Sequence, residues 1–358
     1  MIILHISDIA VKEGNGVVTA ISKYLEFESK NNKVAVFNLG ISIDAHVCLE
    51  FNYANYKSIS SLPSPFNKPD IVVFNEVYKK KYINLSNECT KNQIKYIIIP
   101  HGCLTDLARK KTGSILKKHI AIHFILKSFI ENAVAIQFLN EMEKENTHIK
   151  YNSYIISGNG IDTNIYKKNI CGSKDIIYIG RYDIYHKGID YIIEICNKYR
   201  NWFDKNNIKI YLYGRDSKGN KEIIRKKIEE YSIGNILILG DSVYGKEKEY
   251  ILKNAYAFLQ TSRFEGQPMG ILEALNFGVP CIVTKGTTFA EYVNKNKCGL
   301  GSEPNIDTIF INIKKIIDDK ELRDNMSENA IKCIKRDFDW KVVIDDCVDK
   351  YQSLVFKK

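Results

Sequence analysis

The chain has 358 residues, 45% hydrophobic and 26% charged, a balance typical of globular proteins and a length that suits two domains better than one. No run of eighteen uncharged apolar residues occurs, and the start MIILHISDIA lacks the features of a signal peptide, so we expect a cytoplasmic protein. The nine cysteines are scattered and never spaced C-x-x-C, which argues against a disulfide framework and a zinc site.

The net charge of +10 raises the question of an acidic partner. No helix-turn-helix, zinc-finger or RNA-binding signature accompanies the charge, so we expect no nucleic acid partner. In segment 105–130 six lysines and arginines oppose only Asp106, while apolar residues recur at helical spacing. Such a basic amphipathic stretch can lie on an anionic membrane surface. The alternative is a surface helix whose apolar face packs on its own domain.

In the first half of the chain, short β-branched runs alternate with helical patterns, which predicts a parallel sheet built from βαβ units. The predicted strands are 2–5, 33–38, 70–74, 95–100, 133–138 and 153–156. A loop with Gly14, Asn15 and Gly16 follows the first strand and leads into a helix over 17–30. Such a glycine loop can bring backbone N–H groups against a phosphate, although it often marks only a tight turn.

Polar residues follow two of these strands, where ligands of doubly wound sheets bind. Asn75, Glu76 and Tyr78 come after the strand 70–74, and we expect them to contact an acceptor molecule. His101 follows the strand 95–100 and is a candidate for bonding a ligand hydroxyl. His5 lies within the first strand, which indicates a packed residue whose ring is hydrogen-bonded.

After residues 159–162 the alternating pattern begins again, with predicted strands 175–179, 208–213, 235–239, 255–260 and 280–284. We therefore predict an α/β protein with two Rossmann-like doubly wound domains facing across a cleft. The first comprises 1–165 and is joined by a C-terminal helix over 340–358, and the second comprises 166–339. The hinge is expected near 167–174, a polar stretch that contains a glycine.

Two cations follow the first strand of the second domain. Arg181 comes directly after this strand, and Lys187 precedes the helix predicted over 189–199. Arginine offers a fork of donors and lysine a compact charge, so the pair suits a diphosphate and its departure as a leaving group. The alternative is two solvated loop residues.

The segment 261–280 carries the most information about function. It places Glu265 and Glu273 on either side of a turn that runs into an apolar helical stretch. Pro268 suits the first helical position, and Gly266 and Gly270 let a ligand approach the backbone. The free N–H groups of the helix start then face an anion. Two carboxylates beside an anion site suit a ligand with one negative end and many hydroxyls, which is the chemistry of a nucleotide-sugar.

The pair Asp337 and Asp339 resembles the two-aspartate metal motif of other sugar-transferring enzymes. It lies before the last helix, however, where Asp339 suits an N-cap. We therefore predict a structural role for the pair, no metal site and no bound cofactor.

Together these residues resemble the retaining glycosyltransferases of family 4, which have the GT-B fold. The resemblance covers nearly the whole chain. It is carried by Gly14-Asn15-Gly16, Pro100-His101-Gly102, 132–141, Asn159-Gly160-Ile161-Asp162, Gly180-Arg181, Lys187-Gly188 and 262–275. The two glutamates separated by seven residues in this setting are its most specific part.

The resemblance implies a role for each candidate residue. Glu265 would contact the transferred sugar, Glu273 the ribose hydroxyls, and His101 would lie beside the donor sugar. Backbone N–H groups near the helix start would hold the diphosphate together with Arg181 and Lys187, and Gly16 would close on it from the first domain. The donor-binding residues at the helix start are Gln267, Pro268, Met269, Gly270 and Ile271.

The predicted function is retaining, metal-independent transfer of a hexosyl or N-acetylhexosaminyl group from a nucleotide-diphosphate-sugar, in particular a UDP-sugar. The expected acceptor is a glycan or a polyprenyl-diphosphate-linked glycan, in the synthesis of a surface polysaccharide such as capsule or O-antigen. Because acceptors of this family are often lipid-linked, the resemblance also implies that segment 105–130 binds an anionic membrane surface and that the protein is peripheral on the inner face of the membrane. Two alternatives remain open. One is a hydrolase or epimerase of nucleotide-sugars with the same fold, and the other is a non-catalytic subunit that binds nucleotide-sugars.

Overall fold

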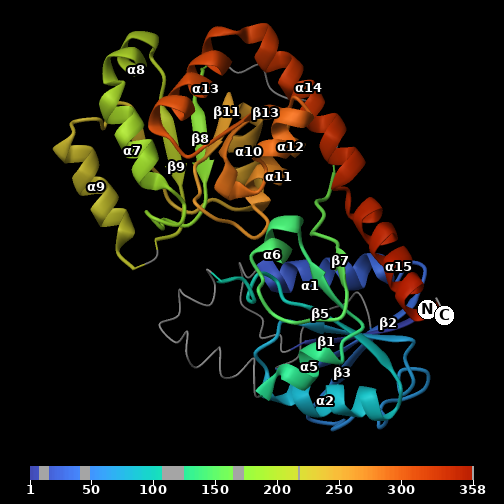
Figure 1. Cartoon of the computed structure of the whole chain (residues 1–358). Helices are drawn as coiled ribbons and strands as arrows, with labels where there is room; N and C mark the ends of the chain where they lie inside the picture. The colour runs from blue at the N-terminus through green and yellow to red at the C-terminus, as the bar shows by residue number, and fades with distance from the viewer. Residues whose placement is uncertain (8–15, 41–48, 107–124, 164–172, 217, 357–358) are drawn as a thin grey trace. The chain divides into compact units, whose positions relative to one another are not determined.

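The computed structural model describes residues 1–7, 16–40, 49–106, 125–163, 173–216 and 218–356 (Figure 1). The chain forms two compact units. Unit 1 comprises Met1–Gly160 and Trp340–Lys358, and unit 2 comprises Ile161–Asp339. The division falls at Gly160, slightly before the boundary predicted after residue 165. Most of the predicted hinge, 167–172, lies outside the described residues.

Unit 1 contains a seven-stranded parallel sheet. Its strands are β1 (Ile2–Ser7), β2 (Lys33–Asn38), β3 (Leu49–Asn52), β4 (Ile71–Asn75), β5 (Lys95–Ile99), β6 (Ala135–Phe138) and β7 (Tyr154–Ile156). The order β3-β2-β1-β4-β5-β6-β7 reverses direction between β1 and β4. This arrangement is doubly wound, and its switch point lies where β1 and β4 end.

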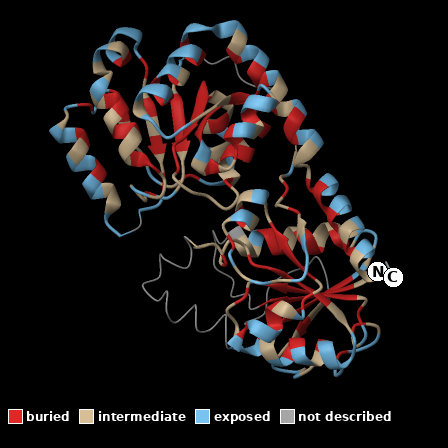
Figure 2. Ribbon diagram, in the orientation of Figure 1, coloured by how far each residue is buried: buried red, intermediate tan, exposed pale blue. Residues whose placement is uncertain are grey.

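Helices cover both faces of this sheet (Figure 1). Helices α2 (Lys80–Lys91) and α5 (Lys127–Glu131) pack on one face, and α1 (Gly16–Glu28) and α15 (Trp340–Phe356) on the other. A short helix, α6 (Glu141–Glu145), follows β6. Successive strand residues point to opposite faces, so Leu4 of β1 packs with α2 and α5 whereas Ile3 packs with α1 and α15. Figure 2 shows the resulting buried strands between partly exposed helices.

Unit 2 contains a six-stranded parallel sheet in the order β10-β9-β8-β11-β12-β13. Its strands are β8 (Ile176–Ile179), β9 (Ile210–Tyr213), β10 (Leu237–Leu239), β11 (Ala257–Gln260), β12 (Cys281–Thr284) and β13 (Gly299–Ser302). The switch point lies between β8 and β11. Strands buried on both faces need continuous apolar runs, and all four residues of β11 are buried.

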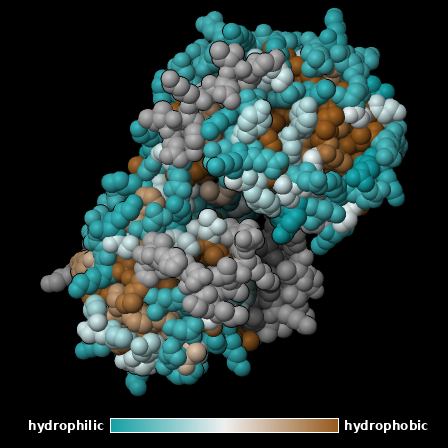
Figure 3. Space-filling model, turned by 180° about the vertical axis from the view of Figure 1, so that it is seen from behind, coloured by the Kyte–Doolittle hydropathy of each residue, from teal (hydrophilic) through white to brown (hydrophobic). Residues whose placement is uncertain are grey.

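The helices of unit 2 also form two layers. Helices α7 (Ile189–Lys198), α8 (Arg200–Asn206), α9 (Asn220–Glu230) and α13 (Ile306–Asp318) pack on one face. Helices α10 (Gly245–Asn254), α11 (Met269–Asn276), α12 (Ala290–Lys295) and α14 (Lys320–Asp337) pack mainly on the other. Hydrophilic residues predominate on the molecular face shown in Figure 3, as the 26% charged content leads one to expect.

The C-terminal helix α15 is anchored in unit 1 by Trp340. This side chain is 4% exposed, and its ring lies 5.8 Å from that of Tyr24 and 6.3 Å from that of Phe27. A Cβ atom at Gly160 would lie 2.7 Å from Trp340, so this position requires glycine. The last segment of the chain is therefore part of the first unit's core.

We expect Trp340→Ala to lower the free energy of unfolding by about 3 to 5 kcal/mol, the usual cost of removing a buried aromatic ring. The matched control on the same helix is Val342→Ala, because Val342 is 44% exposed and its truncation leaves little empty space. Urea unfolding followed by circular dichroism measures both. Similar losses for the two variants would contradict the anchoring role of Trp340.

Candidate functional site

Predicted site residues of unit 2 gather at one edge of its sheet. Arg181 and Lys187 lie in the loop between β8 and α7, and Glu265 lies between β11 and α11. Strands β8 and β11 are hydrogen-bonded neighbours at the switch point. Ligands of doubly wound sheets bind beyond the carboxyl ends of the strands at such a point.

The Glu265 carboxylate is held by three donors. Its Oε1 atom accepts bonds from Lys187 Nζ at 2.6 Å, Ser262 Oγ at 2.6 Å and Gln260 Nε2 at 3.0 Å. The side chains of Glu265 and Lys187 are 9% and 14% exposed. All three bonds converge on Oε1, and no described residue donates a hydrogen bond to Oε2. Glu265 therefore has a fixed orientation, with one oxygen engaged by the protein.

The charge of Glu265 is stabilised within this setting. Burial by itself raises the pKa of a carboxyl group, but the Lys187 ammonium and the bonds from Lys187 and Ser262 outweigh it. The pKa of Glu265 therefore lies below its ordinary value. At neutral pH this position presents an oriented, ionised carboxylate.

A close approach of two loops fixes Lys187. The next residue, Gly188, has a φ of 65°, and a Cβ atom there would lie 1.9 Å from the carbonyl oxygen of Thr261. The hydroxyl of Thr261 donates to the carbonyl oxygen of Gly188 at 2.8 Å. Only glycine fits this position. The loop after β8 can therefore pass close to Thr261, the residue that follows β11, and this brings Lys187 near Glu265.

Arg263 joins the same loop to α7, a contact that the sequence analysis missed. Its guanidinium forms two bonds with the Asp190 carboxylate, at 2.8 and 2.5 Å. It also lies 4.5 Å from the ring of Tyr185 and 4.2 Å from that of Tyr191. Arg263 lies two residues before Glu265 in the loop between β11 and α11. Its contacts with α7 therefore help to fix the position of the Glu265 carboxylate. An arginine two residues before a site glutamate was the only signal in the sequence.

Helix α11 differs from the prediction in two details. It begins at Met269 with Pro268 as its N-cap, so the proline stands one position before the predicted one. The Cβ of a side chain at Gly270 would lie 3.2 Å from the Phe258 ring and 3.3 Å from the Ile179 carbonyl oxygen. Gly270 thus allows α11 to pack on the sheet and does not open the backbone to a ligand, in contrast to Gly266, which has open space around it.

The start of α11 keeps the properties of an anion site. The first N–H groups of a helix have no partner within it, and no acidic residue lies in the first turn of α11. Ile271 is fully buried, and its N–H donates to the carbonyl oxygen of Pro268 at 3.0 Å, so the free N–H groups of the helix start do not include that of Ile271. Met269 packs against the core below, and Gln267 is half-buried.

Glu273 and Arg181 occupy more open positions. Glu273 Oε2 pairs with Lys248 Nζ of α10 at 2.5 Å, and the Glu273 side chain is 29% exposed. Arg181 is exposed, and among the described residues its guanidinium forms no ion pair. Arg181 therefore offers a positive charge, uncompensated by the described residues, in the loop that follows β8.

The candidate residues of unit 1 have different surroundings from those predicted. Asn75 is only 1% exposed, and its amide is hydrogen-bonded on both sides, to His5 and to His101. The Asn75 side chain is thus engaged within the domain, and its contact with an acceptor stays a prediction. Glu76 pairs with Lys79 Nζ at 3.2 Å and is 37% exposed, and Tyr78 packs against the core.

His101 lies at the carboxyl end of β5, as predicted, in a left-handed conformation with a φ of 50°. Its Nε2 atom lies 3.3 Å from Asn75 Oδ1. Burial first, and the neighbouring His5 second, lower the pKa of His101 to about 4. The imidazole is therefore neutral at pH 7. His5 is buried with a hydrogen-bonded ring, as expected for a packed residue.

Glu143 of α6 supports this turn, and the sequence analysis did not identify it. Its carboxylate accepts from the N–H of Gly102 at 2.6 Å and from the N–H of Leu139 at 2.7 Å. Burial raises the pKa of Glu143 above its ordinary value. The backbone after His101 is thus fastened to the segment that follows β6.

Two predicted features fall largely outside the described residues. In the glycine loop, Gly14 and Asn15 are not among the described residues, and Gly16 is the first residue of α1. Of the basic segment 105–130, the part 107–124 is not described. In the remainder, Phe129 and Ile130 of α5 are buried in unit 1, so this end packs on its own domain. Within the described ranges, no helix is both long and apolar enough to span a bilayer.

The two aspartates near the end of unit 2 have structural contacts. Asp337 accepts from the Tyr292 hydroxyl at 2.8 Å and pairs with Arg336 at 2.6 Å. Asp339 accepts from the Thr163 hydroxyl. Among the residues described, no group of three or more His, Cys, Asp or Glu side chains could hold a metal ion.

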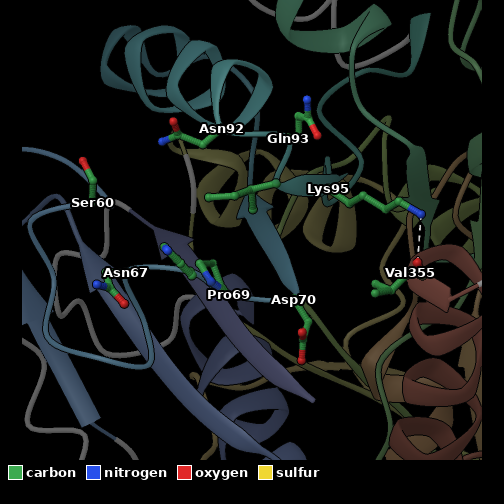
Figure 4. Close-up of a pocket in the computed structure, with 10 residues that line it drawn as sticks. Ser60, Asn67, Pro69, Asp70, Asn92, Gln93, Lys95 and Val355 are labelled. Carbon is green, nitrogen blue, oxygen red and sulfur yellow. Dashed lines mark hydrogen bonds between the residues drawn. The ribbon is translucent and has the colours of Figure 1, made fainter.

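A cavity of about 710 Å³ lies elsewhere, at the amino ends of β4 and β5 in unit 1 (Figure 4). Asp70 and Lys95 line it, and Lys95 Nζ donates to the carbonyl oxygens of Leu354 at 3.0 Å and Val355 at 2.8 Å. These bonds tie the end of α15 to the sheet. The cavity is at the opposite edge from the carboxyl ends, so we do not assign it to the candidate site.

Comparison with known proteins identifies a matching family for unit 2. Residues 161–333 match the model of the family described as Glycosyl transferases group 1. An uncharacterized glycosyltransferase of Methanocaldococcus jannaschii is 26% identical over 187 residues, 50% of this chain and 45% of that protein. The UDP-Gal:alpha-D-GlcNAc-diphosphoundecaprenol alpha-1,3-galactosyltransferase of Escherichia coli is 32% identical over 116 residues, 30% of this chain and 28% of that protein. The chain thus aligns with less than half the length of these curated relatives.

Similarity to solved structures extends over both units. HepE of Anabaena, crystallised in complex with UDP, superposes with a TM-score of 0.74 at 14% identity, over 99% of this chain and 100% of that chain. At this identity the likeness concerns the fold, which is the GT-B fold of two Rossmann-like domains.

We expect Lys187→Met to lower the free energy of unfolding by about 3 to 5 kcal/mol at pH 7, because it leaves a buried carboxylate without its cation. Glu265 has a depressed pKa in the folded wild type, so its contribution is present above the ordinary pKa of 4.5 and is lost as the pH falls through the lower folded value. The difference between variant and wild type should therefore shrink below pH 4.5. Lys227→Met, which removes an exposed pair with Glu230, is the control and should change little. Urea unfolding over about four pH units, from pH 3 to pH 7, measures the difference in unfolding free energy between variant and wild type. A difference that does not change with pH would contradict the lowered pKa of Glu265.

We expect Gly188→Ala to destabilise unit 2 more than Gly219→Ala. Both glycines are left-handed, with φ values of 65° and 75°, but only Gly188 faces another backbone, since nothing lies within 4 Å of a Cβ atom at Gly219. Gly219→Ala should cost about 1 to 2 kcal/mol, the price of the left-handed conformation alone. Thermal and urea unfolding of the two variants measure the excess, and equal losses would show that the loop yields freely.

Proposed function

We propose that this chain, a group 1 glycosyl transferase of GT-B fold, transfers a sugar from a nucleotide-diphosphate-sugar to a hydroxyl group with retention of configuration. The observation that carries the proposal is the Glu265 carboxylate. It is ionised, oriented by Lys187, Ser262 and Gln260, and lies just before the N-terminus of α11. A sugar hydroxyl is a suitable donor for its Oε2 atom.

The proposed donor site separates the two ends of the nucleotide-sugar. The diphosphate binds the N–H groups at the α11 start and the Arg181 guanidinium, which is free of ion pairs with described residues. Glu273, held by Lys248, accepts hydrogen bonds from the ribose. The sugar lies against Glu265. HepE, which has a similar fold, was crystallised in complex with UDP, and on that ground we propose a UDP-sugar as the donor.

In the proposed reaction, the bond between the anomeric carbon and the diphosphate oxygen breaks through an oxocarbenium-like transition state. The acceptor oxygen forms its bond to the same carbon on the same face. The departing diphosphate oxygen takes the proton of the acceptor hydroxyl. Negative charge grows on the diphosphate, and Arg181 and the α11 start stabilise it as pre-oriented groups.

We propose a glycan or a polyprenyl-diphosphate-linked glycan as the acceptor, in surface polysaccharide synthesis on the inner face of the membrane. The support is the name of the E. coli relative, whose acceptor is a diphosphoundecaprenol-linked sugar. The basic segment 105–130 would provide the contact with anionic lipid. Residues 107–124 of this segment lie outside the described ranges.

We expect Glu265→Gln to lower kcat by about 10²- to 10³-fold, because an amide keeps the shape of the side chain and removes its charge. Transfer from a panel of UDP-sugars to glycan acceptors is measured by mass spectrometry, and the anomeric configuration of the product by NMR. Glu303→Gln is the control, because Glu303 is a 62% exposed glutamate of the same unit.

Full activity of Glu265→Gln would overturn the proposed role of this carboxylate. Release of free sugar without transfer to any acceptor would instead assign the chain to nucleotide-sugar hydrolysis. An inverted product would contradict the proposed stereochemistry.

A further inference from the structure

Four polar side chains form a continuous hydrogen-bonded line through unit 1. Glu28 at the end of α1 bonds His5 of β1, with 2.7 Å between Oε2 and Nε2. His5 Nδ1 lies 3.3 Å from Asn75 Nδ2 at the end of β4, and Asn75 Oδ1 lies 3.3 Å from His101 Nε2. Glu28, His5 and Asn75 are each at most 1% exposed. We call this line the buried relay.

The buried relay is costly for the fold. Its neighbours on the same face of the sheet are fully buried apolar residues, among them Ile3, Val73 and Ile97. Polar groups in such a layer lose their hydration, and their hydrogen bonds within the protein offset only part of this free-energy cost. An apolar layer of similar volume would be at least as stable. The fold alone therefore does not account for these residues.

The amide of Asn75 gives the buried relay a direction, because its two ends have opposite hydrogen-bonding character. Its nitrogen donates, so His5 Nδ1 must accept and carries no proton. The proton of the His5 ring then lies on Nε2 and is donated to the Glu28 carboxylate. The oxygen of the Asn75 amide accepts, so the His101 ring carries its proton on Nε2. In the neutral His101 ring, Nδ1 is then left with a lone pair.

We propose that Glu28, His5 and Asn75 are positioning residues that fix the proton of His101 on Nε2 and present its Nδ1 as an acceptor for a substrate hydroxyl. This deepens the proposed function and rests on it, because transfer between sugars requires the recognition of hydroxyl groups. A neutral ring with an acceptor nitrogen excludes the diphosphate of a nucleotide-diphosphate-sugar as the group recognised, since its fully ionised phosphates have no proton to donate at neutral pH.

The backbone of this turn is fixed as firmly as the ring. His101 and Gly102 both have left-handed φ values, 50° and 80°. For histidine this conformation is unfavourable and persists only where the surroundings enforce it. The Glu143 carboxylate holds the N–H of Gly102, and the buried relay holds the ring from the other side. His101 is thus constrained in backbone, rotamer and tautomer together.

The tautomer is measured on the ligand-free full chain by ¹⁵N NMR with labelled histidine, and His101→Gln identifies the signals of residue 101. In the wild type at pH 7 we expect Nε2 protonated and Nδ1 unprotonated. In Asn75→Leu we expect a mixture of tautomers. A wild-type His101 protonated on Nδ1, or a tautomer that Asn75→Leu leaves unchanged, would overturn the proposal.

Asn75→Asp is the conservative variant and guards against misfolding of Asn75→Leu. A carboxylate accepts at both ends, so it keeps the Nε2 proton of His101 and raises the pKa of this ring by about one to three pH units. Asn38→Leu is the matched control, since Asn38 is a buried asparagine at the end of β2 that bonds Glu50 and lies outside the buried relay. It should leave the His101 tautomer unchanged, and a change there would reduce the effect of Asn75 to general loosening of the unit.

Activity provides the second measurement. We expect Asn75→Leu to lower kcat about tenfold, the loss of one oriented hydrogen bond, and to have no further effect in a His101→Gln background. Additive effects would show that Asn75 does not act through His101 and would overturn the proposal. Because the NMR experiment needs no substrate, failure of the proposed function and failure of the buried relay are observed separately.

Discussion

The contact between the Lys187 ammonium and the Glu265 carboxylate is the interaction on which the candidate site depends. It forms because β8 and β11 end side by side and because Gly188 lets the loop after β8 pass directly over Thr261. A side chain at Gly188 would separate the two loops and with them the two charges. The packing of backbone on backbone therefore determines where the charged groups lie, and the ion pair follows from it.

This ion pair brings order and charge more than stability. Removing two charges from water costs free energy that their attraction only partly returns, so an apolar pair of similar size would be at least as stable. What the ion pair achieves is different. It keeps Glu265 ionised in a place where burial would otherwise favour the neutral acid, and it fixes one carboxylate oxygen. Such orientation before binding is what a site needs to stabilise charge during a reaction.

The sequence predicts the architecture well because parallel strands have a strong signature. The run Lys33–Asn38 is a strand with the predicted bounds. At each end of the other predicted strands, the structure differs from the prediction by no more than two residues. The two missed strands are short edge or glycine-rich segments. Leu49–Asn52 carries charge and polar groups, and Gly299–Ser302 has no β-branched residue. Their strand conformation comes from pairing with a neighbour, which no local pattern reveals.

The candidate site was predictable only in part. The strand-end rule brings Lys187 near Glu265, but the charge pairing between them depends on how closely the loops approach. Gly270 was expected to let a ligand approach the backbone, but it instead lets α11 pack on the Phe258 ring of β11. The sequence around Gly270 does not reveal this contact, because Phe258 lies in the preceding strand. Asn75 is predicted to contact an acceptor because it follows a predicted strand. His5, two strands of sequence away, withdraws it into the domain.

The two units treat their strand-end polar groups in opposite ways. Unit 2 concentrates charge around one switch point, with an ionised glutamate, an arginine that pairs with no carboxylate of the described ranges, and the positive end of a helix dipole. Unit 1 suppresses charge, since burial keeps His101 neutral and the Asn75 amide gives the ring a defined acceptor. Charged groups select a diphosphate, whereas neutral oriented groups select hydroxyls by the geometry of their hydrogen bonds. The proposed transfer from a nucleotide-sugar to a hydroxyl acceptor requires both kinds of recognition, and under that proposal each unit of this chain supplies one of them.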